Sequence, residues 1–262
     1  MRRLLHSLLS RHASLYLYML RLLKRGTIEK KIFLALIRPG DVVFDVGANE
    51  GYFTLLASDL VGSGGKVHAF EPVPPTFRKA EANLLQMQVY NNYCLNLFAC
   101  SDEAGDVMLH VPEKDFGQAS MRVQDAGSWK DVQNIETYCS RAIRLDDYIN
   151  EHQISRVDFM KIDVEGAELH ALRGSQKMIG RFRPMLFLEV CESWMRNFQC
   201  APPDLAAFLL DHGYTDFFIA GNKVERTSDI KRALAELPVT ASVNVLCVTA
   251  AHAERIERMS LI

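Results

Sequence analysis

The 262 residues suit one large α/β domain with a short appendage, because a single hydrophobic core stops growing near about 250 to 300 residues. Hydrophobic residues make up 48% of the chain and charged residues 24%, which excludes an intrinsically disordered chain and a coiled coil. The formal net charge of −2 gives no reason to expect a nucleic-acid partner.

The first 31 residues differ in charge from the rest, with eight basic residues against one acidic residue, Glu29. Leucines and methionines of residues 1–26 recur at roughly helical spacing, but arginines interrupt each apolar run. These runs are too short for a membrane span, which takes about 20 apolar residues, and they do not resemble a signal peptide. We expect residues 1–37 to form a basic amphipathic helical extension, either packed on the domain or resting on an anionic membrane surface.

From Arg38 onward, short apolar runs alternate with helical patterns, which predicts βαβ units, a mostly parallel sheet and a domain over residues 38–262. Seven strands are predicted, at residues 41–46, 66–70, 91–100, 156–162, 183–190, 215–220 and 242–250. Helices are predicted at residues 51–61, 74–88 and 202–213 and in the segment after Asp163. The polar segment 112–138 has no clear period, and we expect it to be an excursion over the substrate side of the site.

The six cysteines form no C-x-x-C pair and have no histidine at zinc-ligand spacing, so neither a zinc site nor a disulfide framework is predicted. A reducing, cytoplasmic compartment is the simpler interpretation.

A glycine-rich turn, Gly47-Ala48-Asn49-Glu50-Gly51, follows the first predicted strand and precedes a helix. Such a turn lets the backbone approach a ligand, and in open α/β sheets ligands lie at the carboxyl ends of strands. The spacing is G-x-x-x-G, whereas a dinucleotide pyrophosphate site has G-x-G-x-x-G. Asp45 and Glu50 would repel a pyrophosphate but suit a ligand that carries an ammonium and a sulfonium charge.

Glu71 ends the second predicted strand, where a carboxylate can accept hydrogen bonds from both hydroxyls of a ribose. The turn and Glu71 together indicate S-adenosylmethionine, and Asp45, Tyr52 and Pro72 are predicted to belong to the same cofactor site. The alternative is that the glycines serve only a tight turn and that Glu71 is a solvated strand end.

A second group of charged residues follows two later strands. Lys161 and Asp163 lie near the end of a predicted buried strand, Glu165 follows them, and Glu189 ends the next strand. Burying such charges unpaired would cost several kcal/mol, so they either pair with each other or act at the carboxyl edge of the sheet. If the two strands are neighbours, the three carboxylates converge on one rim.

Methyl transfer from a sulfonium to an oxygen needs alignment, neutralisation of charge and removal of the acceptor's proton. We predict Asp163 as the carboxylate that removes this proton, with Glu165, Lys161 and Glu189 as further catalytic candidates. A divalent ion held by the carboxylates is an alternative, and we favour a site without metal. For Lys161 we favour an ion pair with Asp163 or Glu189 over a catalytic role.

Five segments in this order resemble the FkbM-type methyltransferases: FDVGANEGYFTLLAS, HAFEPVP, LDDYI, VDFMKIDVEGAELHALRGS and RPMLFLEV. The resemblance covers about Pro39 to Val190. It implies a class I methyltransferase fold, which is a Rossmann-like, seven-stranded, mostly parallel sheet with helices on both faces and an antiparallel last strand. It also implies S-adenosylmethionine as the cofactor.

The resemblance assigns roles to individual positions. Gly47, Asn49 and Gly51 would line the methionine part of the cofactor and Glu71 its ribose. Ser101 and Asp102 would lie near the adenine, and Asp163 and Glu165 near the methyl group. The acceptors of this family are diverse hydroxyls of sugars and polyketides, so we expect a hydroxyl of a sugar, glycan or secondary metabolite as the acceptor.

Two other functions remain as alternatives. One is an NAD(P)-dependent oxidoreductase on the same kind of sheet, against which the G-x-x-x-G spacing argues. The other is a non-catalytic binding module that retains the fold.

Overall fold

The computed structural model describes residues 27–87, 90–113, 118–124, 129, 134–221 and 223–257. The predicted basic head, residues 1–26, lies outside these residues, as does much of the polar segment 112–138. Within the described ranges no helix has both the length and the apolar character needed to cross a membrane.

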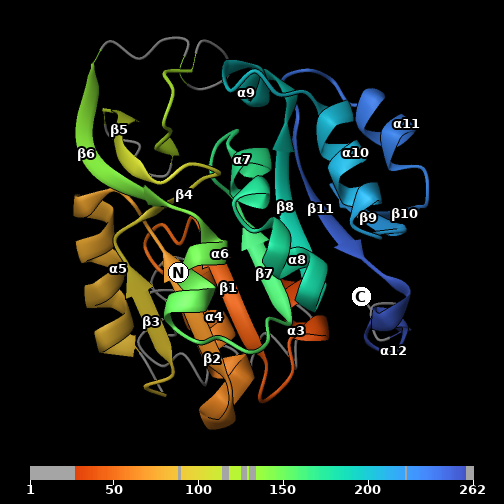
Figure 1. Cartoon of the computed structure of the whole chain (residues 1–262), viewed down its shortest axis with the longest axis horizontal. Coiled ribbons are helices and arrows are strands. Elements are labelled where there is room, and N and C mark those ends of the chain that lie inside the picture. The colour runs from red at the N-terminus through yellow and green to blue at the C-terminus, as the bar shows by residue number, and fades with distance from the viewer. Residues whose placement is uncertain are drawn as a thin grey trace, which may run out of the picture.

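The molecule is built on an eight-stranded sheet in the order β10-β9-β11-β8-β7-β1-β2-β3 (Figure 1). Strands β3, β2, β1, β7 and β8 are parallel, and β11 pairs antiparallel with both β8 and β9. The predicted class I methyltransferase sheet with an antiparallel last strand is therefore confirmed. The strands are β1 (Val42–Val46), β2 (Lys66–Phe70), β3 (Tyr93–Asn96), β7 (Phe159–Ile162), β8 (Met185–Cys191), β9 (Asp216–Ala220), β10 (Val224–Thr227) and β11 (Ser242–Val248).

The predicted number of seven strands was one too low for this sheet. The eighth strand, β10, lies at the edge and pairs antiparallel with β9. Its sequence VERT is largely exposed, so it lacks the continuous apolar run that marks the central strands.

Helices cover both faces of the sheet, which explains why its central strands are apolar throughout. Phe33 of α3 packs with Val43 and Phe159 on one face, whereas Leu169 of α7 packs with Phe44 on the other. The helices are α3 (Ile28–Leu36), α4 (Tyr52–Val61), α5 (Pro74–Met87), α6 (Leu145–Glu151), α7 (Glu168–Arg173), α8 (Gln176–Phe182), α9 (Glu192–Asn197), α10 (Pro202–Asp211), α11 (Ile230–Ala235) and α12 (Ala253–Ile256), with 3₁₀ turns η1 (Gly62–Gly64) and η4 (Ala250–His252).

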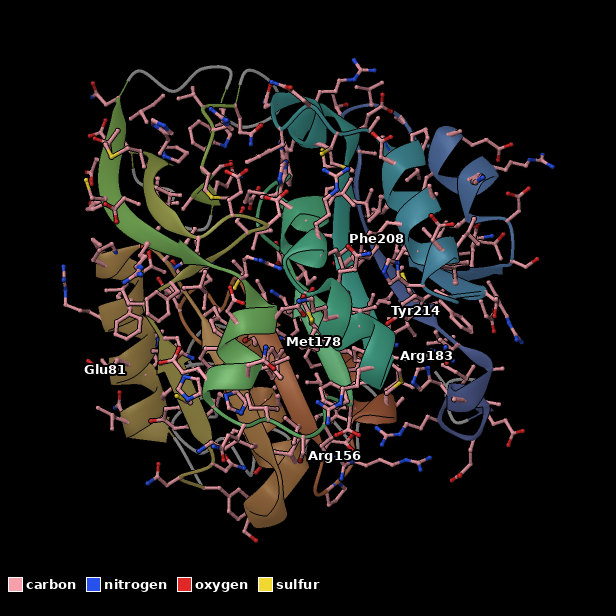
Figure 2. The ribbon with its side chains drawn as sticks, in the orientation of Figure 1. Glu81, Arg156, Met178, Arg183, Phe208 and Tyr214 are labelled. Atoms are coloured by element: carbon pink, nitrogen blue, oxygen red, sulfur yellow. The ribbon has the colours of Figure 1, made fainter. Side chains whose placement is uncertain are left out.

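The exposure of individual side chains agrees with this arrangement of helices on the sheet. Met178 of α8 is buried against the sheet, whereas Glu81 of α5 is exposed at the outer surface (Figure 2). The hydroxyl of Tyr214 is buried and donates a hydrogen bond to the carbonyl of Pro184 at 2.7 Å. This bond ties the segment before β9 to the start of β8.

A second, three-stranded sheet stands beside the carboxyl ends of the main strands (Figure 1). It has the order β4-β6-β5, with β4 (Ala99–Cys100), β5 (Gly105–Pro112) and β6 (Ile135–Ile143). The single strand predicted over residues 91–100 was wrong, because it divides into β3 and β4. Asn96 donates its side-chain amide to the carbonyl of Ala69, and the chain then leaves β2 so that β4 pairs with β6.

Candidate active site

A pocket opens at the carboxyl ends of β1, β2 and β7, where the sheet topology predicts a ligand. We call it the first pocket. Its lining residues are Val46, Gly47, Asn49, Phe70, Glu71, Pro72, Phe98, Ala99, Cys100, Leu109, Ala119, Met121, Asp163, Val164 and Glu165.

The glycine-rich turn forms one wall of the first pocket. Gly47 has φ of +81°, and a Cβ at this position would lie 1.9 Å from the carbonyl oxygen of Asp163. The amides of Gly47 and Ala48 donate to the carbonyl of Phe70 at 3.0 and 2.9 Å. A glycine is therefore required here, because the turn passes directly over the end of β7 while it bends toward β2.

Glu71 holds this turn against the end of β2. Its carboxylate accepts hydrogen bonds from the amides of Asn49 and Val73, both at 2.9 Å, and the residue is 5% exposed. Burial raises the pKa of Glu71 to about 7, although both amide hydrogen bonds act in the opposite direction. The carboxyl group therefore changes its charge near neutral pH.

Lys161 is a buried cation that contacts residues at the ends of both β1 and β7. Its Nζ lies 3.1 Å from Asp163 Oδ2 and 3.7 Å from Asp45 Oδ1, and it donates to the carbonyl of Gly47 at 3.2 Å. Burial disfavours the charged form, but the two aspartates outweigh it and raise the pKa of Lys161. The ion pair that we favoured over a catalytic role is therefore present with Asp163. The sequence did not predict Asp45 as a second partner.

Asp45 lies beneath the turn rather than in the pocket. It is buried, accepts a hydrogen bond from the hydroxyl of Thr54 at 2.6 Å, and does not line the first pocket. Burial raises its pKa, against the influence of Lys161. Asp45 therefore holds α4 through Thr54 and pairs with Lys161, rather than facing a ligand.

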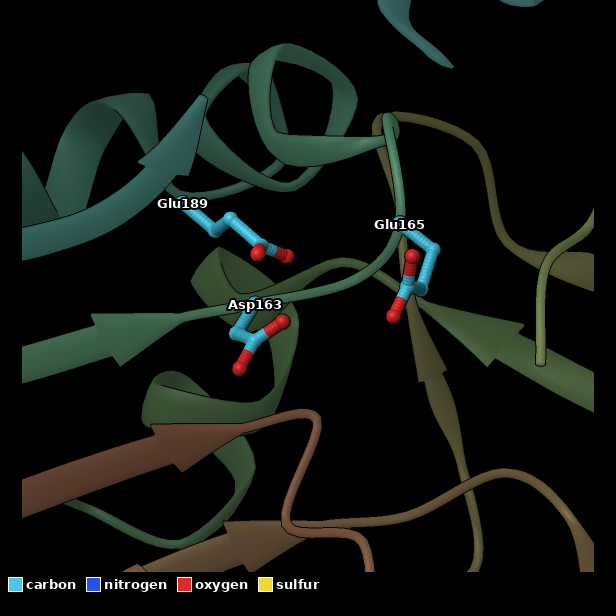
Figure 3. A group of neighbouring side chains, drawn as sticks. All are labelled: Asp163, Glu165 and Glu189. Carbon is cyan, nitrogen blue, oxygen red and sulfur yellow. The ribbon is translucent and has the colours of Figure 1, made fainter. Parts of the chain in front are cut away.

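The three predicted carboxylates do converge. Asp163, Glu165 and Glu189 come from the ends of β7 and β8, and one carboxylate oxygen of each lies within 4.8 Å of the others (Figure 3). They come together because β7 and β8 are neighbours in the sheet, which was the condition for their predicted convergence. Among the described residues they are also the group that could hold a metal ion.

The charges within this cluster are unequal. Glu189 hydrogen-bonds with Asp163 and accepts the hydroxyl of Ser242 at 2.5 Å. Burial and the charge of Asp163 raise the pKa of Glu189. Burial acts on Asp163 in the same direction, but Lys161 and the hydrogen bond from Glu189 hold its pKa below the usual value. The two opposite shifts favour the proton on Glu189 and the negative charge on Asp163.

The other predicted cofactor residues are distributed differently. Pro72 lines the first pocket, whereas Gly51 caps α4 beneath the turn and Tyr52 lines a neighbouring pocket. Ser101 and Asp102 are outside the first pocket. Asp102 instead pairs with His170 Nδ1 at 2.9 Å.

Several site residues were not predicted from the sequence. Phe98, Ala119 and Met121 line the first pocket, and the side chains of Ser120 and Gln124 donate to the carbonyl of Glu165 at 3.2 and 3.0 Å. These contacts place residues 118–124 of the polar segment beside the first pocket. No periodicity in the sequence marks residues 118–124, since they belong to an irregular segment.

The sheet order, with an antiparallel strand inserted beside β8, and the pocket at the carboxyl rim define the class I methyltransferases. The model of the "Methyltransferase FkbM domain" matches residues 45–215. The chain therefore belongs to the FkbM methyltransferase family and is a methyltransferase that depends on S-adenosylmethionine.

The chain is also similar to individual proteins. The chain is 30% identical over 219 residues to "31-O-demethyl-FK506 methyltransferase FkbM" of Streptomyces tacrolimicus, covering 73% of this chain and 81% of the relative. It is 26% identical over 187 residues to "Methyltransferase 1" of Beauveria bassiana, covering 63% and 73%. The solved structure of methyltransferase FkbM from Methylobacillus flagellatus matches with a TM-score of 0.48 and 15% identity, covering 83% of this chain and 50% of that one.

Proposed function

We propose that the protein is an O-methyltransferase that acts on a hydroxyl of a sugar, glycan or secondary metabolite. The observation that carries this proposal is the position of Asp163, which lines both the first pocket and a second one. The second pocket is lined by Thr27, Glu29, Lys30, Tyr52, Phe53, Lys161, Asp163, Phe187, Glu189 and Asn244. A carboxylate that borders two pockets can accept a proton from a ligand in one pocket while the reacting atom of a second ligand lies in the other.

The residues of the first pocket fit S-adenosylmethionine. Glu71 offers a buried carboxylate to the ribose hydroxyls, and Gly47 leaves the space beside Asp163 free of a side chain. The ionised Asp163 suits a sulfonium charge. The pocket has a volume of about 70 Å³ in this structure.

When bound, S-adenosylmethionine supplies a methyl carbon that bonds to the acceptor oxygen as its bond to sulfur breaks, leaving S-adenosylhomocysteine. The acceptor's proton has to pass to a group of the protein, and the ionised carboxylate of Asp163 can accept it. Lys161 remains protonated beside it and orients the carboxylate. Glu189 donates a hydrogen bond to Asp163, which stabilises the ionised form of that carboxylate.

We propose that this chemistry proceeds without a metal ion. A divalent ion binds best to ionised carboxylates. Protonation of Glu189 and the positive charge of Lys161 both lower the net negative charge of the Asp163–Glu165–Glu189 cluster, which disfavours such an ion. Methyl transfer unchanged in EDTA is the expected result, and loss of transfer that Mg²⁺ restores would contradict it.

Oxygen as the methylated atom is supported by the name of the Streptomyces relative, "31-O-demethyl-FK506 methyltransferase". A small-molecule or carbohydrate acceptor, no nucleic-acid partner and a cytoplasmic location remain our predictions. Contact of the basic residues 1–26 with a membrane surface also remains a prediction, and it falls outside the described residues.

Asp163→Asn tests the proposed role of the carboxylate. The amide keeps the shape of the side chain but cannot accept the proton, so methyl transfer should fall by about 10²-fold or more while S-adenosylhomocysteine still binds. Transfer of labelled methyl to hydroxyl compounds in sugar and metabolite extracts measures turnover, and isothermal titration measures binding. Turnover that survives Asp163→Asn would refute the role of Asp163, and label recovered on nitrogen or carbon would refute O-methylation.

A further inference from the structure

Glu165 has a left-handed backbone conformation, which residues with long side chains rarely adopt. Its φ is +55°, and Gly166 follows with a φ of +102°. Steric overlap of the Cβ disfavours this conformation in any residue except glycine, so it persists only where neighbouring groups hold it. A glycine or an asparagine would form the same turn with less strain. The glutamate at this position therefore has a purpose beyond the turn itself.

The left-handed turn places the carboxylate of Glu165 at the first pocket. Glu165 lines that pocket, Glu189 lines the second one, and Asp163 borders both. One carboxylate oxygen of each lies within 4.8 Å of the others (Figure 3). Glu165 is thus the member of the cluster on the proposed cofactor side. Its negative charge can favour a cofactor with a positively charged sulfur over a product whose sulfur is uncharged.

Buried side chains hold the peptide group between Glu165 and Gly166 at both ends. Its N–H, from Gly166, donates to Glu168 Oε1 at 3.2 Å. Its carbonyl, from Glu165, accepts hydrogen bonds from Ser120 Oγ at 3.2 Å and from Gln124 Nε2 at 3.0 Å. Glu168, Ser120 and Gln124 are all buried. Because both ends of the peptide group are bound, it cannot rotate, and the backbone of Glu165 stays in the left-handed region.

Gln124 is the residue of this group whose own orientation is fixed from a third element. Its Oε1 accepts a hydrogen bond from Asn197 Nδ2 of α9 at 2.6 Å, so its Nε2 is the end that faces the carbonyl of Glu165. Ala119 and Met121, close to Gln124 in the chain, line the first pocket. Residues 118–124 therefore form part of the wall of this pocket and also bind the turn that carries its carboxylate.

We infer that Gln124 is a positioning residue, which holds the left-handed turn at Glu165 and thereby keeps the charge of the Glu165 carboxylate in the first pocket, next to Asp163. The first pocket consequently favours the positively charged S-adenosylmethionine over S-adenosylhomocysteine. This inference rests on the proposed binding of S-adenosylmethionine in the first pocket. It assigns to one side chain of the polar segment a part in distinguishing cofactor from product.

Isothermal titration of the full chain with S-adenosylhomocysteine and with sinefungin tests the inference. Sinefungin is a stable analogue that carries an ammonium group in place of the methylated sulfur. Gln124→Met keeps the length of the side chain but cannot donate to the carbonyl of Glu165. We expect it to lower the affinity for sinefungin about fivefold, and that for S-adenosylhomocysteine by less than about twofold.

A double variant separates positioning from a general loss of structure. Glu165→Gln should itself reduce the preference for sinefungin about fivefold or more. Adding Gln124→Met to Glu165→Gln should cause no further loss of this preference, because both changes act through the same carboxylate. Asn197→Ala, which leaves residues 118–124 intact, should weaken the preference in the same direction and provides the test if Gln124→Met does not fold.

Gln176→Met is the matched control, because Gln176 is exposed at the start of α8 and lines neither pocket. An equal loss of affinity for both ligands in Gln124→Met would overturn the inference, as would a loss of preference that Gln124→Met still causes in the Glu165→Gln background. Either result leaves the proposed O-methylation standing. Methyl label recovered on nitrogen or carbon would instead refute O-methylation and leave the charge preference of the first pocket intact.

Discussion

Glu71 is a single residue whose ionisation should control cofactor affinity. Its carboxylate has a pKa raised to about 7 by burial, and only the ionised form can accept hydrogen bonds from both ribose hydroxyls with its two oxygens. The fraction of this form increases as the pH rises through 7. We therefore expect the association constant for S-adenosylhomocysteine to increase between pH 6 and pH 8, by at most about tenfold per pH unit, and then to level off.

Isothermal titration at pH 6, 7 and 8 measures this dependence. Glu71→Gln, which has no ionisable group at this position, should bind more weakly and lose the pH dependence. A wild-type affinity that stays constant over this range would contradict the role of Glu71, as would an equal pH dependence in Glu71→Gln.

The junction between β1 and α4 depends on the absence of a side chain at Gly47. Gly47→Ala combines a left-handed φ of +81° with overlap against the carbonyl of Asp163 on β7. The first cost is about 1 to 2 kcal/mol and the second about 1 to 3 kcal/mol, so we expect a loss of roughly 2 to 5 kcal/mol in the free energy of unfolding. Affinity for S-adenosylhomocysteine should fall as well, because the turn moves away from Asp163.

Gly213→Ala separates these two costs. Gly213 follows α10 with the same φ of +81°, and a Cβ there meets no atom within 4 Å. Urea unfolding should therefore show only the conformational cost for this variant, with cofactor binding intact. Equal destabilisation by the two substitutions would show that the contact between the turn and β7 contributes nothing.

The helices and strands differ in how far their sequences define them. Central strands such as β1 and β8 are buried on both faces, so their continuous apolar runs predict them well, and parallel neighbours bring Asp163 and Glu189 to one rim. The edge strand β10 is exposed and carries no such pattern. The second pocket joins Glu29 to Asn244, which are 215 residues apart, and only the folded sheet brings them together.

The stability of the whole molecule should depend on a buried acid that lies outside both pockets. Glu168 of α7 is 1% exposed and accepts hydrogen bonds from the amides of Val164 and Gly166 at 3.0 and 3.2 Å. Burial raises its pKa from 4.5 to about 7, despite these hydrogen bonds. The folded protein therefore binds a proton at this site between about pH 4.5 and pH 7, whereas the unfolded chain releases it.

The sign of the pH dependence follows from this difference. Stability from the neutral form of Glu168 is complete below pH 4.5 and is lost as the pH rises through about 7, with an upper limit of ~3 kcal/mol. Glu168→Gln is uncharged at every pH, so its free energy of unfolding relative to the wild type should increase by up to that amount between pH 5 and pH 8. Urea unfolding of both proteins at the two pH values measures the change. The exposed Glu103→Gln should show no such trend, and a difference between Glu168→Gln and the wild type that stays constant with pH would refute the buried-acid account.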